Sequence, residues 1–264
     1  MRAWTVFLTA FSLLGAGCAT LGLNAEVART WETAQVYLPP PRAWHEAFRP
    51  ADVPVPDRPL PTVVYLHGCK GITGNDTGWA AQLTAAGYAV VMPRSFARKY
   101  RPTNCEPSTH TAGWSPEVHD MRQEEIAYTL AKLRELSWID QRNVFLMGHS
   151  EGGLAVALWH GGEFRGHIIS SWTCSNRSWP AHDGIWAPAR IPVLAISFTS
   201  DPWYKGTYME GSCEAKFGGR KFARQVAIPG PGHFTWQEQE ARDAVTDFLR
   251  THTIREARAV GVPR

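Results

Sequence analysis

One serine lies between two glycines in the pattern Gly-x-Ser-x-Gly, which runs from Gly148 to Gly152 with Ser150 at its centre. An apolar segment, residues 143–147, comes before the pattern, and a run of small residues, 153–157, comes after it. This order predicts a sharp turn from a buried strand into a helix, in which side chains at the two glycine positions would collide. Such a turn lifts the serine hydroxyl above the sheet edge, beside free N–H groups and the positive end of the helix dipole. We interpret Ser150 as a nucleophile; the alternative is a glycine-rich turn with an incidental serine.

A serine hydroxyl is a weak nucleophile unless a histidine removes its proton and a carboxylate orients that histidine. In open sheets covered by helices, such residues lie on loops at the carboxyl ends of strands. Asp201 directly follows the apolar segment 192–200 and is the predicted acid, although Asp-Pro also commonly starts a turn. Asp183 is the rival acid, in an irregular loop after an earlier strand.

His233 is the predicted base. It follows a strand expected over residues 225–228 and a turn of alternating Pro and Gly at 229–232, which favours a loop of fixed shape. The alternative is a solvated loop histidine. Two other histidines are weaker candidates, because His182 lies in a loop without a preceding strand and His252 lies at the end of the last expected helix.

Acyl transfer also needs N–H donors for the negative oxygen that forms in the transition state. The backbone N–H of Glu151 is one candidate by its position after the nucleophile. The second is expected from the loop that follows the strand 62–66, where His67-Gly68 allows the main chain to bend back toward the serine. We predict the N–H of Cys69 as this donor, with Gly68 as the register alternative.

The elements that must position these residues alternate along the chain. Strands are expected at 34–38, 62–66, 88–92, 143–147, 166–172, 192–198 and 225–228, and helices at 76–86, from 116 to about 133, at 151–160 and at 236–250. Strands that are apolar on both faces and alternate with helices predict an α/β fold, with a mostly parallel sheet covered on both sides.

Composition limits the class of protein. A chain of 264 residues that is 44% hydrophobic can bury a full core, so we expect a single domain over residues 23–264. The net charge is only +3 and no long run of Lys or Arg occurs, which argues against nucleic acid as a partner.

Residues 1–22 are typical of an export signal, because Arg2 precedes an apolar run that is too short for a membrane span. Small residues before Cys18 resemble a bacterial lipoprotein box, in which cleavage before the cysteine is followed by its lipidation. Ordinary cleavage between Gly17 and Ala25 and a buried N-terminal helix are the alternatives. We expect an exported protein: periplasmic, or attached to the outer membrane through a lipid on Cys18, with secretion as the alternative.

Four further cysteines agree with export: Cys69, Cys105, Cys174 and Cys213. In an oxidising compartment they can form two disulfides in several pairings, and unpaired buried thiols are the alternative. No C-x-x-C or H-E-x-x-H spacing occurs, so a zinc site is not expected, and we predict neither a metal nor a cofactor.

Taken together, these segments resemble the α/β-hydrolase superfamily, and the segments 65–71, 87–98 and 148–153 are similar to its dienelactone-hydrolase-related branch. The resemblance spans about residues 60–250 and implies an α/β-hydrolase fold. In the strand order of that fold, it also implies the disulfides Cys69–Cys105 and Cys174–Cys213. Dienelactone hydrolases proper use a cysteine nucleophile, so Ser150 favours a serine esterase instead.

Residues 175–191 lack helical periodicity, so we expect an open cleft without a large lid. Trp172, Trp203 and Trp114 map to loops on the face of the serine. Their broad, mostly apolar rings predict a pocket wall for an apolar or aromatic group, with ordinary loop packing as the alternative.

The sequence therefore predicts a serine hydrolase that cleaves small-molecule carboxylic esters through an acyl-enzyme, with Ser150, His233 and Asp201 as its triad. A dienelactone hydrolase-like lactonase, a peptidase or an acyltransferase with the same triad are alternatives. A non-catalytic envelope lipoprotein is a further one.

Overall fold

The computed structural model describes residues 25–40, 46–113 and 115–255, so the predicted lipidation site Cys18 and the predicted pocket residue Trp114 lie outside the described residues. Seven strands form one sheet in the order β1-β3-β2-β6-β7-β8-β9. In chain order these strands are β1 (Gln35–Tyr37), β2 (Leu60–Leu66), β3 (Ala89–Met92), β6 (Ile139–His149), β7 (His167–Ser170), β8 (Val193–Phe198) and β9 (Ala223–Ile228). All neighbouring strands are parallel except β1, which pairs antiparallel with β3. The predicted mostly parallel sheet is confirmed.

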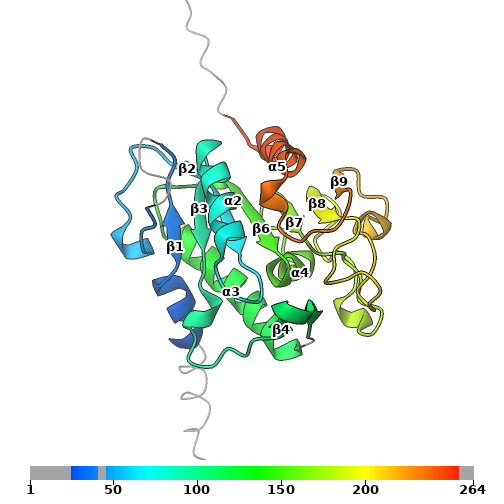
Figure 1. Ribbon diagram of the computed structural model, residues 1–264. Coiled ribbons are helices and arrows are strands. Elements are labelled where there is room, and N and C mark those ends of the chain that lie inside the picture. Colours follow the sequence, from blue (N-terminus) through cyan, green and yellow to red (C-terminus); the bar gives the residue numbers. More distant parts are fainter. Residues whose placement is uncertain (1–24, 41–45, 114, 256–264) are drawn as a thin grey trace, which may run out of the picture.

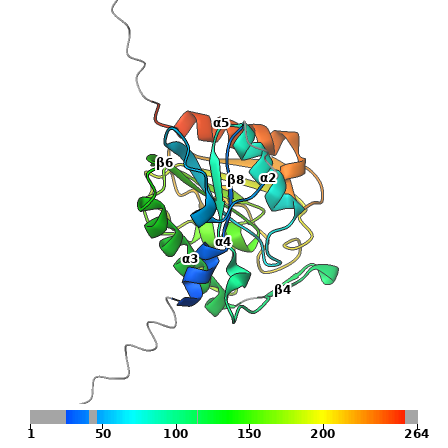
Figure 2. The same ribbon diagram turned by 90° about the vertical axis from the view of Figure 1, so that its left-hand side faces the viewer.

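Helices cover both faces of the sheet, as predicted (Figures 1 and 2). On one face, α3 (Pro116–Arg134) and α4 (Glu151–Ala157) pack against the side chains that β2 and β6 direct to that side. On the other face, α2 (Gly74–Ala85) and α5 (Gln239–His252) pack against the alternate residues of the same strands. The carboxyl ends of the parallel strands therefore lie at one edge between these two layers.

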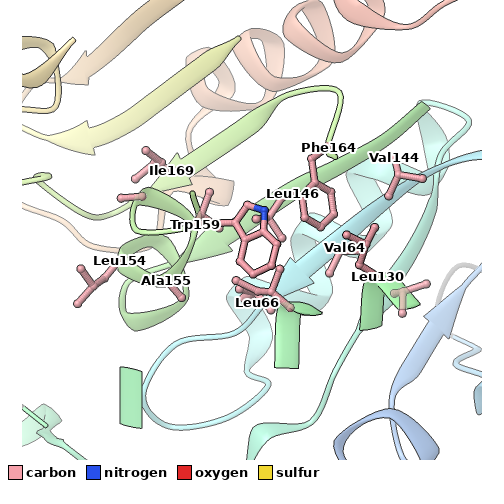
Figure 3. Close-up of a cluster of buried hydrophobic side chains, with 14 of the residues drawn as sticks. Val64, Leu66, Leu130, Val144, Leu146, Leu154, Ala155, Trp159, Phe164 and Ile169 are labelled. Carbon is pink, nitrogen blue, oxygen red and sulfur yellow. The ribbon is translucent and has the colours of Figure 1, made fainter. Parts of the chain in front are cut away.

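The central strands are buried on both sides because their residues are apolar almost without interruption. Val64 and Leu66 of β2 and Leu146 of β6 lie in the core beneath α3 and α4, where Leu130 and Leu154 complete the cluster (Figure 3). The intervening residues of both strands lie in the second core, beneath α2 and α5. Two successive layers of buried side chains hold the two central strands rigidly, and these strands carry the loop after β2 and the turn after β6.

The observed elements differ from the expected ones mainly at their ends. β6 begins at Ile139, before the predicted apolar run, because Leu60 of β2 pairs with Ile139 across a local irregularity in the register. A hairpin of two short strands, β4 (Cys105–Glu106) and β5 (Thr111–Ala112), lies within the segment expected as a loop. Strands of two residues are too short to show an alternating apolar and polar pattern in the sequence.

Both disulfides implied by the strand order are present in the structure. Cys69–Cys105 joins the loop after β2 to the β4–β5 hairpin, and Cys174–Cys213 joins the loops that follow β7 and β8. Two disulfides are in keeping with an oxidising compartment. Among the described residues, no helix has the length and apolarity needed to cross a membrane.

The segment after β7 also agrees with the absence of a large lid. Within residues 175–191, the structure has a single short 3-10 helix, η4 (Pro180–His182), and otherwise irregular backbone. Access to the carboxyl ends of the strands is therefore bordered by loops.

Candidate active site

Ser150 lies in the predicted turn between β6 and α4. Its backbone has φ 57° and ψ −116°, a conformation that L residues other than glycine rarely adopt. A Cβ at Gly148 would collide with the carbonyl of Gly152, and a Cβ at Gly152 would collide with the carbonyl of Leu66. The Ser150 N–H donates to the Ser170 carbonyl at 2.9 Å, which ties the turn to β7. The two glycines are thus required by close approach, as the sequence pattern predicted.

The structure brings Asp201 and His233 together. Nδ1 of His233 lies 2.7 Å from Oδ2 of Asp201, and the other oxygen, Oδ1, accepts a hydrogen bond from the Trp203 N–H at 3.0 Å. Both side chains are buried. A carboxylate at Nδ1 favours the tautomer in which Nδ1 carries the proton, so that Nε2 is free to accept one. This is the arrangement that a general base needs.

His233 and the loop that presents it are held by contacts from three neighbouring segments. The Ser171 hydroxyl donates to the His233 carbonyl at 2.5 Å. The Trp203 ring packs beside the imidazole with 5.3 Å between ring centroids, and the His149 ring packs at 4.8 Å. These contacts restrict the imidazole to a narrow range of orientations.

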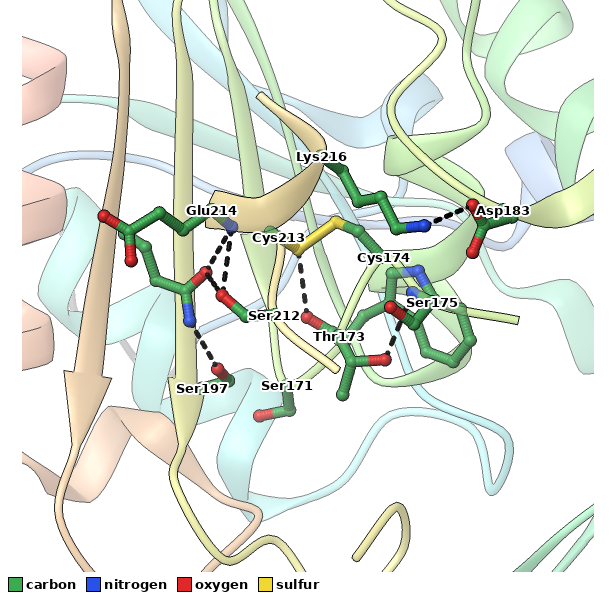
Figure 4. Close-up of a disulfide and its surroundings, with 12 residues drawn as sticks. Ser171, Thr173, Cys174, Ser175, Asp183, Ser197, Ser212, Cys213, Glu214 and Lys216 are labelled. Carbon is green, nitrogen blue, oxygen red and sulfur yellow. Dashed lines mark hydrogen bonds and ion pairs between the residues drawn. A yellow bond between two sulfur atoms is a disulfide. The ribbon is translucent and has the colours of Figure 1, made fainter. Parts of the chain in front are cut away.

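The rival acid and bases have their contacts elsewhere. Asp183 forms an ion pair with Lys216 at 2.5 Å and accepts from the Asn176 N–H at 2.8 Å, in the region of the Cys174–Cys213 disulfide (Figure 4). His182 stacks on Trp186. His252 packs edge-on against Phe248 at the end of α5. The structure therefore pairs His233 with Asp201 and not with the rival acid.

The loop after β2 passes directly beside the serine. A Cβ placed on Gly68 would lie 3.5 Å from the Cβ of Ser150, so a side chain at this position would be in van der Waals contact with the serine. Among the described residues, no backbone hydrogen bond outside helices and strands uses the N–H of Cys69 or of Glu151. As the first residue of α4, Glu151 has no carbonyl partner within its own helix either. Both predicted oxyanion donors are thus placed near Ser150 without a competing backbone acceptor.

Two cavities meet at Ser150, and both are bordered by Cys69 and Trp203. The first has a mainly apolar and aromatic wall, formed by the Cys69–Cys105 disulfide, Ala112, Leu154, Trp172, Tyr204 and Met209. The second includes the base and its neighbours: Gly68, Thr73, His149, His233 and Phe234. Trp172 lines the first cavity, and Trp203 lines both.

A comparison with protein families finds that the model of the dienelactone hydrolase family matches residues 49–168, which contain the β2 loop and the Ser150 turn. Solved structures share the fold. Est1E from Butyrivibrio proteoclasticus is 14% identical, with a TM-score of 0.53 over 83% of this chain and 93% of that chain. A phospholipase/carboxylesterase from Dyadobacter fermentans is 15% identical, with a TM-score of 0.51 over 75% and 93% of the two chains.

The chain has the α/β-hydrolase fold, and its residues 49–168 are similar to the dienelactone hydrolase family. Esterase PE8 has the same fold at 21% identity, with a TM-score of 0.51 over 75% of this chain and 95% of that chain. A search of curated proteins found no match to this sequence.

Sequence reasoning missed one residue of this hydrolase site, Tyr204. Its hydroxyl donates to the Ser171 carbonyl at 2.9 Å, and the residue lines the first cavity together with Ser150. Burial, together with the nearby carboxylate of Asp201, raises the pKa of Tyr204 well above its usual value, so the phenol stays protonated at neutral pH. Tyr204 lies in the turn that begins at Asp201, so its position after the strand was the one available indication.

Proposed function

We propose that this α/β-hydrolase is a serine carboxylesterase. The observation that carries the proposal is the Ser150 turn, which borders the same cavity as a His233 that is hydrogen-bonded to Asp201. Acyl transfer through a serine requires a nucleophile, a base and an acid that orients the base. All three lie at the carboxyl edge of the sheet.

In the proposed reaction, Oγ of Ser150 attacks the ester carbonyl carbon while its proton passes to Nε2 of His233. The backbone N–H groups of Glu151 and Cys69 stabilise the resulting oxyanion. The bond to the alcohol oxygen then breaks, and His233 returns the proton to that oxygen. Water, activated by His233, attacks the acyl-enzyme and releases the acid by the same steps.

The two cavities suggest where the halves of the ester bind. Because His233 must protonate the leaving oxygen, the alcohol belongs in the second cavity, which His233 lines. The acyl group then occupies the first cavity, where Trp172, Tyr204 and Met209 favour an apolar or aromatic acyl group of modest size. Est1E, which has the same fold, has been solved with ferulic acid, an aromatic acid, bound to it.

We also propose that the protein acts outside the cytoplasm. The export signal at residues 1–22 and the two disulfides support this, and a lipid on Cys18 would hold the enzyme at a membrane.

A series of p-nitrophenyl esters from acetyl to lauryl, with benzoyl added, tests the function and the acyl pocket together. We expect kcat/KM to be highest for short or aromatic acyl groups. Met209→Ala removes side-chain volume from the wall of the first cavity, so it should shift the preference toward longer acyl chains by about tenfold. Phe234→Ala, in the second cavity, is the matched control and should leave the acyl preference unchanged.

Two results would contradict this account. If no ester of the series is cleaved by the folded protein, the esterase proposal fails. If the esterase is active but Phe234→Ala, and not Met209→Ala, changes the acyl preference, the assignment of the two cavities is reversed.

A further inference from the structure

A cluster of charged side chains is buried directly beneath the Ser150 turn. It comprises three arginines and two glutamates, Arg98, Arg101, Arg122, Glu125 and Glu151, and the exposed Glu124 pairs with Arg98 at its edge. The side chains of Arg122 and Glu125 have no exposed surface, and that of Glu151 is 4% exposed. Burying charged side chains costs free energy unless each of them has a partner. Solubility, the usual role of charged residues at the surface, therefore does not explain this cluster.

Arg122, on α3, contacts both segments that carry the proposed oxyanion donors. Its Nη2 donates to the carbonyl of His67 at 2.9 Å, at the start of the loop that leads to Cys69. Its Nε lies 3.8 Å from Oε1 of Glu151, the residue that follows the nucleophile. One guanidinium therefore bridges the loop after β2 and the turn after β6.

The rest of the guanidinium is held in place by the same cluster. Nη1 of Arg122 donates to Oε2 of Glu125 at 3.1 Å, and Oε1 of Glu125 accepts from the Ser95 hydroxyl at 2.7 Å. The Ser95 N–H donates to Nε2 of His67 at 3.1 Å, so the His67 residue is fixed through both its carbonyl and its ring.

Glu151 is held from the opposite side. Its Oε1 forms an ion pair with Nη2 of Arg101, and the Nε of Arg101 donates to the Ser95 hydroxyl at 2.7 Å. The connections from His67 through Ser95 and Arg101 to Glu151, and from Glu151 through Arg122 back to His67, form a closed ring. Displacement of either loop would break contacts at both ends of the ring.

We propose that Arg122 is a positioning residue that sets the distance between the two backbone N–H donors of the oxyanion site. Its planar guanidinium presents donors in fixed directions, so it can hold a carbonyl and two carboxylates at once, which the point charge of a lysine cannot do. Arg122 touches neither the ester nor the reacting atoms. It acts through His67 and Glu151, and the inference rests on the proposed esterase function.

Arg122→Lys, compared with Arg98→Lys, tests this role. Arg98 is also buried in the cluster, but its hydrogen bonds go to Glu124, Glu125 and the Met121 carbonyl, on α3 and away from both loops. For Arg122→Lys we expect kcat to fall about 10- to 100-fold with KM changed only a few-fold, since misplaced donors matter in the transition state and not in substrate binding. Arg98→Lys should change neither value more than a few-fold.

The affinity for trifluoroacetophenone distinguishes a positioning role from a purely structural one, because a purely structural role would leave this affinity unchanged. Ser150 adds to this ketone, and the product carries an oxyanion like that of the transition state. Its dissociation constant should rise for Arg122→Lys by the same factor by which kcat/KM falls, and should stay close to the wild-type value for Arg98→Lys.

The outcomes separate the two proposals. If the wild-type protein cleaves no ester, the proposed function fails. If the wild type is active and Arg122→Lys equals Arg98→Lys in kcat and in ketone affinity, the positioning role is overturned. Should Arg122→Lys show no cooperative thermal unfolding, Glu151→Gln tests the other end of the bridge, because it keeps the backbone N–H and removes the side-chain charge; unchanged kcat and ketone affinity there would also overturn the proposal.

Discussion

Replacing Ser150 by alanine is expected to lower kcat for p-nitrophenyl acetate by about 10⁵- to 10⁶-fold, because no acyl-enzyme can form without the hydroxyl. The loss should exceed that of any other single substitution in the site. The alanine side chain is no larger than that of serine, so it fits this crowded turn. The midpoint of thermal unfolding should therefore stay close to that of the wild type. Initial rates with an excess of enzyme, together with a thermal melt, measure both quantities.

Ser197→Ala is the matched control for this loss. Ser197 is a buried serine at the end of β8 whose hydroxyl accepts from Gln225 at 3.4 Å, and it lines neither cavity at Ser150. Its replacement should leave kcat within a few-fold of the wild type. If Ser150→Ala retains turnover, the nucleophile is a residue other than Ser150.

Asp201→Asn should have the second largest effect, a fall in kcat on the order of 10³- to 10⁴-fold with KM little changed. Asn keeps the shape of the side chain, but its amide no longer offers a charged acceptor to Nδ1 of His233. The imidazole can then take the wrong tautomer, and its charged form loses a stabilising carboxylate. Steady-state kinetics over a range of esters measures the split between kcat and KM.

Asp183→Asn provides the comparison for the acid. Asp183 was the rival in the sequence, and its carboxylate is bonded to Lys216 and the Asn176 N–H. That substitution should cost less than about tenfold in kcat, because the ion pair is partly exposed to solvent and lines neither cavity at Ser150. A larger loss in Asp183→Asn than in Asp201→Asn would exchange the roles of the two aspartates.

The central sheet and the turn at Ser150 could be predicted from the sequence because both depend on local patterns. Apolar runs such as 62–66 and 143–147 can be buried only as strands or core helices, and the glycines at 148 and 152 mark a turn where backbones approach too closely for side chains. Asp201 and His233 could be predicted because both lie in loops that follow strands. Their pairing required only that neighbouring strands end at the same edge.

The buried ion-pair cluster could not be predicted in the same way. Arg98, Arg101 and Arg122 appear in the sequence as charges on a loop and on an amphipathic helix, where a solvated position is the ordinary expectation. Their burial depends on the loop after β3 folding back over α3, which is a tertiary contact without a local pattern. The β4–β5 hairpin escaped prediction for a related reason, since its two strands have two residues each.

The most direct test of the account is covalent labelling of the folded wild-type protein with a fluorophosphonate, followed by mass spectrometry of its peptides. We expect one label per chain, on Ser150, with loss of ester turnover in proportion to labelling and no label in Ser150→Ala. A folded wild-type protein that stays unlabelled at Ser150, or that cleaves esters at full rate once Ser150 is labelled, would contradict it.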